Sequence, residues 1–218
     1  MSMVNQNKPS SENDAARCVE ELISKFLSLK DFGTVSVIRP SRVIEPFHSL
    51  LAHDSHMTVA MESFHEHAVS LNVVKVVTDE VDGEIFYTRE ILLTSPQFQS
   101  EKFGLSPRLR VLPRGHEHIV QYGIVRIASD RLPKDVVTRI QAGGTPLGRI
   151  LIEADLHRDV RCVSLFEVIL GPHFSKLCPG LEPGGTSRTY GRFATISISS
   201  KPVIELFEVV IPPASERR

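Results

Sequence analysis

From residue 68 onward the sequence changes from helical to extended periodicity, and six segments rich in Val, Ile, Phe and Tyr follow one another. We predict strands there, because β-branched and aromatic side chains favour extended backbone. The predicted strands span 68–77, 85–93, 120–128, 160–170, 193–198 and 203–211. Asp82-Gly83 and the stretch 199–202 are predicted as turns between consecutive strands. A sheet of six strands is therefore the expected frame of the fold.

Short helices are predicted in most of the remaining chain. The first third is expected to be helical, with one helix over about 14–29 and shorter ones near 47–51 and 54–64. Two more are expected near 133–140 and 147–152, and the Gly/Pro-rich stretch 171–188 is expected to be a long surface loop. Hairpins and short helices join the strands, in place of regular βαβ units. The predicted class is therefore α+β, an antiparallel six-stranded sheet with helices packed on it.

Composition and charge narrow the classes of function. Residues 1–13 are polar and expected to be a disordered tail, and 14–218 are expected to form a single domain. A net charge of -1 gives no footprint for nucleic acid or for an anionic membrane. Three widely spaced cysteines and no apolar run of about 20 residues indicate a reducing compartment and a cytoplasmic protein. No metal site is expected, because the histidine pairs have no Cys or Asp spacing that completes a ligand set.

Charged residues interrupt two of the apolar strands. Arg89 shares a strand face with Tyr87 and Ile91, and Glu208 shares one with Leu206. A buried ion costs several kcal/mol unless it is paired or finds a ligand. Two interpretations stay open: a structural Arg–Glu pair or a solvent face, and a small-molecule site. In the second, Arg89 binds a carboxylate bidentately, and Glu208 meets a hydroxyl or acts as an acid.

A second constellation is the turn before the helix near 147–152. Pro146 suits a first helical turn, which leaves the N–H groups of Leu147 and Gly148 without intrahelical partners. Gly148 has no side chain to block a ligand, and free amides of this kind bind anions. Alone this signal is weak, because Gly–Pro turns before helices are common.

Taken in order, these segments resemble the chorismate pyruvate-lyase family. The resemblance runs from about residue 45 to 212. Its signatures in this sequence are Thr88-Arg89-Glu90-Ile91-Leu92-Leu93, Thr145-Pro146-Leu147-Gly148-Arg149, Leu156-His157-Arg158-Asp159, Tyr190-Gly191-Arg192, Lys201-Pro202 and Glu208-Val209-Val210-Ile211-Pro212. Leu50-Leu51, Asp54-Ser55 and Met57-Thr58 look like the family's N-terminal helix and flap.

The resemblance implies a six-stranded antiparallel sheet with helices on one side and a pocket closed by two helical flaps. It also implies an activity: chorismate is split into 4-hydroxybenzoate and pyruvate without metal or cofactor, as a supply for quinone or secondary metabolism. Arg89 would bind the benzoate carboxylate with help from the amides of Leu147 and Gly148. Glu208 would meet the 4-hydroxyl or ether oxygen as the catalytic group, and Met57 would lie on a flap near the ligand.

Three departures keep alternatives open. The stretches 96–118 and 172–188 are longer than the family pattern, and one extra residue stands between Pro202 and Glu208. Glu205 is therefore a rival for the site glutamate. A divergent enzyme acting on another substrate and a non-catalytic module that binds a small acid both remain as hypotheses. The sequence does not distinguish a monomer from a dimer.

Overall fold

The computed structural model describes residues 12–104, 117–178 and 187–212. Its strands pair antiparallel throughout one sheet, in the order β1-β5-β6-β7-β4-β3-β2. The strands are β1 (Gly33–Ile38), β2 (Ser70–Val81), β3 (Glu84–Ser95), β4 (His118–Ala128), β5 (Arg158–Leu170), β6 (Arg188–Ile198) and β7 (Lys201–Val210). The predicted α+β class with an antiparallel sheet is confirmed.

The sheet has one strand more than predicted, and that strand is β1. It has six residues, and the first third of the chain was expected to contain helices only. Pairing with β5 creates it, from Gly33 opposite Leu170 to Ile38 opposite Leu165. Gly33 has a φ of 123°, and a Cβ there would collide with the Ile169 carbonyl oxygen. A long-range contact therefore fixes this strand, and local periodicity does not reveal it.

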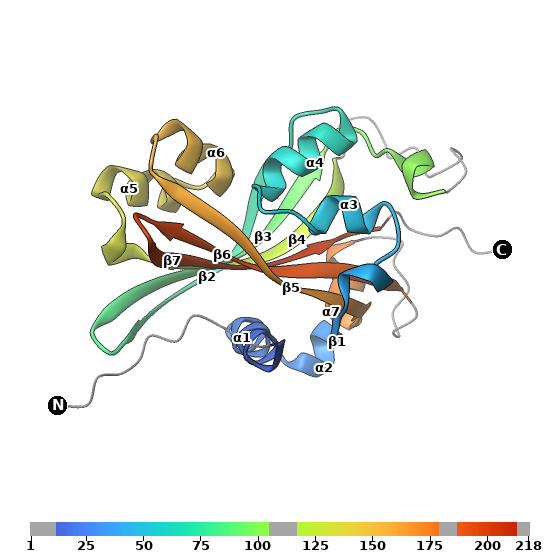
Figure 1. Ribbon diagram of the computed structural model, residues 1–218, viewed down its shortest axis with the longest axis horizontal. Coiled ribbons are helices and arrows are strands. Elements are labelled where there is room, and N and C mark those ends of the chain that lie inside the picture. The colour runs from blue at the N-terminus through green and yellow to red at the C-terminus, as the bar shows by residue number, and fades with distance from the viewer. Residues whose placement is uncertain (1–11, 105–116, 179–186, 213–218) are drawn as a thin grey trace.

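Helices cover both faces of the sheet rather than one (Figure 1). The first face carries α3 (Phe47–Leu51), α4 (Met57–His65), α5 (Lys134–Ala142) and α6 (Leu147–Glu153). The second carries α1 (Glu12–Ser24), α2 (Leu29–Phe32) and α7 (Pro172–Leu177). Each face has its own apolar core, because the central strands present apolar side chains on both sides. Short 3-10 turns lie at Pro40–Arg42, Ser100–Phe103 and Ser129–Arg131.

The second face holds the main differences from the predicted helices. α1 begins at Glu12, before the predicted position 14, and ends at Ser24, and α2 follows as a separate turn. Part of the predicted 171–188 loop is α7, whose Phe174 is fully buried against Phe32 and Tyr122. Residues 179–186 and the tail over 1–11 lie outside the described residues. A short apolar helix thus covers the sheet where composition alone indicated a loop.

Among the described helices, none is both long and apolar enough to cross a membrane.

Candidate functional site

A cavity lies on the first face, between the sheet and the helices α4 and α6. Met57 and Thr58 enter it from α4, and Leu147 and Gly148 from α6. Its polar lining on the strands is Gln121 of β4, Arg192 of β6 and Glu208 of β7, and the remaining walls are His56, Leu71, Ile91, Leu93, Val125, Pro146, Val160, Ile196 and Leu206. The cavity volume is about 30 Å³, roughly the share of one water molecule in the liquid. The structure therefore shows this site closed.

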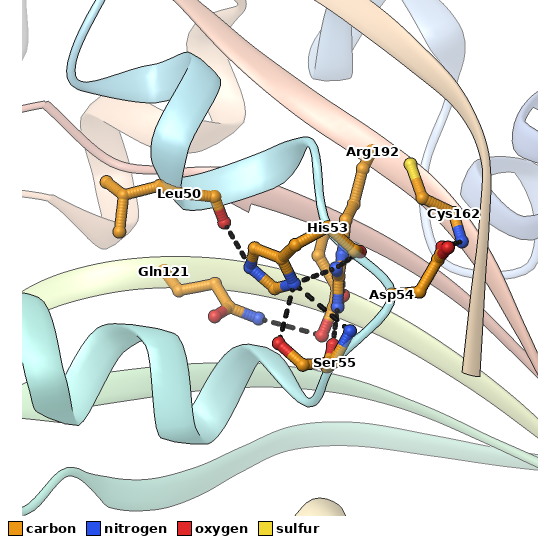
Figure 2. A network of polar contacts seen from close by, with 8 residues as sticks. Leu50, His53, Asp54, Ser55, Gln121, Cys162 and Arg192 are labelled. Carbon is orange, nitrogen blue, oxygen red and sulfur yellow. Dashed lines mark hydrogen bonds and ion pairs between the residues drawn. The ribbon is translucent and has the colours of Figure 1, made fainter. Parts of the chain in front are cut away.

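Arg192 is the centre of the polar network in this cavity (Figure 2). Its Nε donates to Glu208 Oε2 at 2.8 Å, and the two residues lie directly opposite each other on β6 and β7. Nη1 donates to the His53 carbonyl at 2.8 Å and contacts His53 Nδ1 at 3.1 Å, and Nη2 donates to the Ser55 carbonyl at 3.0 Å. Gln121 Nε2 donates to the other oxygen of Glu208 at 3.3 Å. Every nitrogen of the Arg192 guanidinium is therefore already bonded.

The segment 52–56, which links α3 to α4, is held to the sheet at several points. Besides the Arg192 contacts, Asp54 Oδ1 accepts the N–H of Cys162 on β5 at 2.7 Å, and His53 Nε2 lies 2.8 Å from the Leu50 carbonyl oxygen (Figure 2). Burial and the Arg192 charge lower the pKa of His53 below its ordinary value. A neutral imidazole beside a buried guanidinium avoids repulsion between two cations. The network thus fastens the proposed flap over the cavity.

His56 lies between α6 and β5. Its Nε2 accepts from Arg158 Nε at 3.0 Å, and burial followed by the charges of Arg158 and Arg192 lowers its pKa to about 4. Its ring also stands against the Cα of Gly148, where an added Cβ would come within 3.0 Å of the His56 Cβ. The absent side chain of Gly148 thus makes room for His56, whereas we predicted that it makes room for a ligand.

Arg89 is fully buried on β3 and has no carboxylate partner among the described residues. Its Nη1 donates to the Ile140 carbonyl at the end of α5 at 3.1 Å, while Nε and Nη2 have no hydrogen-bond partner there. Burial lowers the pKa of its guanidinium. Arg89 is not a lining residue, but Val125 directly opposite it and Ile91 two positions along both line the cavity. Arg89 is thus a direct neighbour of two lining residues and does not line the cavity itself.

The structure brings together four of the five predicted site residues. Met57, Leu147, Gly148 and Glu208 line one cavity, and Arg89 lies beside it. No backbone acceptor is found for the Leu147 and Gly148 amides among the described residues, since the first bonds of α6 begin at Arg149 and Ile150. The arginine that contacts Glu208 is Arg192, so Arg89 and Glu208 do not form the structural pair considered from the sequence.

Glu205, the rival glutamate, lies on the other face of β7. Its carboxylate pairs with Arg126 of β4 at 3.3 Å, and both side chains are partly exposed. Its direct opposite on β6 is Thr195. Of the two glutamates on this strand, only Glu208 reaches the cavity among the described residues.

Sequence reasoning missed Arg192, Gln121, His53 and His56 as site residues. Arg192 was quoted within the Tyr190-Gly191-Arg192 signature but was given no role. The signal that marked Arg89, a charge among apolar neighbours on a strand, applies equally to Arg192, which follows Tyr190 and precedes Phe193 and Ala194. Gln121, His53 and His56 do not stand out from their neighbours in the sequence. Only the folded chain brings Gln121 and His56 to the cavity and His53 to Arg192.

Glu90, the other charge on β3, faces the opposite side of the sheet. It is fully buried, accepts from Tyr122 Oη at 2.9 Å and lies 2.7 Å from His173 Nε2 of α7. Burial alone would raise the pKa of Glu90, but the bonds from His173 and Tyr122 outweigh it and hold the pKa below its ordinary value. These contacts anchor α7 to the sheet. Among the described residues, no group of three or more His, Cys, Asp or Glu is arranged to hold a metal ion.

Comparison with known proteins found similar structures only. No family model and no curated protein matches the sequence. PhnF from Mycobacterium smegmatis is 8% identical in sequence and has a TM-score of 0.49. The matched region covers 72% of this chain and 64% of PhnF, so this chain spans less than two thirds of that protein. A second similar structure is the ligand-binding domain of a protein from Bordetella bronchiseptica that is described as a GntR-family transcriptional regulator. It is 14% identical with a TM-score of 0.42, and the match covers 69% of this chain and 89% of that domain. YydK from Bacillus subtilis, described as a possible transcriptional regulator, is 10% identical with a TM-score of 0.42, and the match covers 95% of this chain and 83% of YydK. All three TM-scores are below 0.5.

Proposed function

We propose that this chain binds a small organic carboxylate beneath α4 and α6, with Arg89 as the cation that holds it. The observation that carries the proposal is a fully buried guanidinium whose Nε and Nη2 have no hydrogen-bond partner in the described part of the chain. Buried arginines in native proteins are nearly always paired or fully hydrogen-bonded, because an uncompensated charge costs several kcal/mol. A ligand anion would remove that cost.

The two free donors have the geometry that a carboxylate requires. Nε–H and Nη2–H lie on the same edge of a guanidinium and point in nearly parallel directions, which allows a bidentate pair with two carboxylate oxygens. Arg192 cannot serve in this way, because its Nε, Nη1 and Nη2 already bond to Glu208, His53 and Ser55. Of Arg89 and Arg192, it is therefore Arg89 that has donors free for an anion among the described residues.

The walls of the cavity favour an apolar body with a polar far end. Ile91, Val125 and Leu206 form an apolar surface on which a ring can lie, and Gln121 and Glu208 offer polar atoms beyond it. Entry requires an opening, because the cavity of about 30 Å³ is far below the ~300 Å³ of a typical ligand pocket. The segment 52–56 is the part that would move, since hydrogen bonds that involve the side chains of Arg192, Asp54 and Arg158 hold it to the sheet.

A chorismate lyase activity is the second candidate, favoured by the gathering of Met57, Leu147, Gly148 and Glu208 around one cavity. The reaction would need Glu208 to pass a proton, but both of its oxygens accept from Arg192 and Gln121. Catalysis would therefore require the Arg192–Glu208 pair to separate as the substrate enters. Binding requires no such step, and it is the function that the site supports best.

Calorimetric titration with 4-hydroxybenzoate tests the proposal. We expect the unchanged protein to bind and Arg89→Met to lose at least about 30-fold in affinity, since removing one partner of a buried charge pair costs ~2–5 kcal/mol. Arg139→Met is the matched control, because Arg139 makes a surface pair with Glu153. Equal affinity of Arg89→Met and the unchanged protein would overturn the proposal.

Incubation with chorismate separates the two candidates. Release of pyruvate and 4-hydroxybenzoate in equal amounts assigns the lyase reaction. Intact chorismate that competes with 4-hydroxybenzoate for the site assigns binding without turnover.

A further inference from the structure

The outer edge of β2 has no partner strand among the described residues. β2 is the last strand of the sheet order and has 12 residues, whereas β1 at the opposite edge has six. A strand at a sheet edge presents a row of unpaired N–H and C=O groups, to which another strand can add. β2 is therefore the longer of the two edges open to another chain.

This edge has charged side chains and one bulge, which hinder pairing, but it lacks other features that protect edge strands. It contains no proline, and its one bulge lies near its start, between Val73 and Lys75. Three of its valines are exposed, Val73 by 36%, Val76 by 45% and Val81 by 42%. In Figure 1 the β2–β3 hairpin projects at the lower left of the sheet, below α5 and to the left of α1.

We propose that β2 pairs antiparallel with β2 of a second copy of this chain, about a two-fold axis at Val77. In this register Lys75 stands opposite Asp79 of the second copy, and Asp79 stands opposite its Lys75. Lys75, Val77 and Asp79 share one face, because the strand alternates regularly after the bulge. The two Val77 side chains meet at the axis, and Val76 is covered by Thr78 of the second copy on the other face.

The charges select this register among the alternatives. An axis at Lys75 or at Asp79 would place two like charges opposite each other, which is destabilising. An axis at Val76 or Thr78 would place Lys75 or Asp79 opposite Val77 and leave the charge unpaired. Directly opposed side chains must share a face, so Lys75 cannot stand opposite Glu80. Pairing about Val77 is the arrangement that matches opposite charges twice.

A free oxygen on Asp79 supports the same register. Asp79 Oδ2 pairs with Lys25 of its own chain, while Oδ1 is buried without a hydrogen-bond partner among the described residues. The Lys75 side chain is exposed and forms no ion pair with any other described residue of its own chain. The Asp79 side chain is 24% exposed, so the ammonium of Lys75 from the second copy would approach the carboxylate from solvent, and Oδ1 would gain a donor as the carboxylate turns toward it.

Mixed charge reversal tests this interface by sedimentation velocity. The unchanged protein should sediment at twice its 24.3 kDa mass and dissociate on dilution. Lys75→Asp should be monomeric, because Asp would face Asp79 twice, and Asp79→Lys should be monomeric, because Lys would face Lys75 twice. Mixed in equal amounts, the two variants should form a heterodimer in which both pairs are again opposite in charge.

The mixture is its own control for folding, because each variant carries the same intramolecular changes alone and mixed. Circular dichroism of each variant checks that it is folded. Three results would overturn the proposal: a monomeric unchanged protein at its highest soluble concentration, dimers of either single variant, or a mixture that stays monomeric.

Discussion

Arg192 Nε and Glu208 Oε2 lie 2.8 Å apart across β6 and β7, and the side chains of both residues are almost wholly buried, at 1% and 7% exposure. The same strand β7 carries a second pair on its other face, Glu205 with Arg126, whose side chains are 31% and 20% exposed. One strand therefore offers two ion pairs in different surroundings. The buried pair is the one that fastens the segment 52–56, since Arg192 also holds His53 and Ser55.

Glu208→Ala should lower the free energy of unfolding by about 3–5 kcal/mol, because it leaves Arg192 buried without its counter-ion. Glu205→Ala should cost about 1 kcal/mol or less, since partly exposed pairs contribute little. Urea unfolding of both variants measures the difference. Equal losses would show that burial does not set the strength of the Arg192–Glu208 pair.

Arg89→Met should raise the stability of the ligand-free protein by about 1–4 kcal/mol, because a buried charge without a counter-ion costs several kcal/mol and the lost bond to the Ile140 carbonyl returns only about 1 kcal/mol of that. Nε and Nη2 of Arg89 have no hydrogen-bond partner among the described residues, so when no anion is bound these two groups do not offset the free-energy cost of burying the charge. Thermal unfolding without added carboxylate measures the change. A large loss of stability would instead assign Arg89 a structural role through its bond to Ile140.

Gly148→Ala should destabilise the protein, because the new Cβ would come within 3.0 Å of His56. Overpacking costs about 1–3 kcal/mol, whereas alanine favours a helix by about 1 kcal/mol over glycine. The closest atom is the His56 Cβ, which alanine would keep, so the background is His56→Gly, in which the clash is absent and Gly148→Ala should become stabilising. A double-mutant cycle by urea unfolding measures this reversal of sign, and additive effects of the two substitutions would contradict it.

Acid should weaken the fold between about pH 6.5 and 4. The folded protein holds the pKa of His56 at about 4, below the ordinary 6.5, through burial and the charges of Arg158 and Arg192. The unfolded chain therefore binds a proton in this window that the folded chain excludes, so stability falls as the pH falls. His65, with a pKa lowered to about 4 by burial and Lys102, acts in the same direction.

Urea midpoints measured across this window test the assignment. His56→Gln should reduce the pH dependence, and His56→Gln/His65→Gln should reduce it further. An unchanged slope in the double variant would show that other groups cause the loss. Glu90 acts mainly at lower pH, because its pKa lies below the ordinary value in the folded protein and its contribution is lost as pH falls through that lowered pKa.

Strong local patterns made much of this fold predictable. Runs of Val and Ile, the Asp82-Gly83 turn and Pro146 located six strands and the start of α6. β1 was not predicted, because it forms only by pairing with β5. α7 was not predicted, because the Gly and Pro residues around Phe174 indicated a loop. Both depend on contacts between residues far apart in the sequence.

The sequence marked buried charges where a residue stood out from its strand. Arg89 and Glu208 were marked because each is a charge among apolar neighbours, and both are buried. Their partners were not predictable, because strand order puts Arg192 beside Glu208 and the α3–α4 segment brings His53 to Arg192. Side-chain identity marks a buried charge, whereas topology determines which charge neutralises it.

Side-chain NMR of the arginine Nε–H groups during titration with 4-hydroxybenzoate is the most direct test of the proposed anion site. Arg89→Met identifies the Arg89 resonance by its absence. The account predicts that the Arg89 Nε–H signal moves downfield and saturates with the ligand, as a free donor acquires a carboxylate partner. A saturating shift of the Arg192 signal with the Arg89 signal unchanged would contradict it, and would place the carboxylate at the Arg192–Glu208 pair.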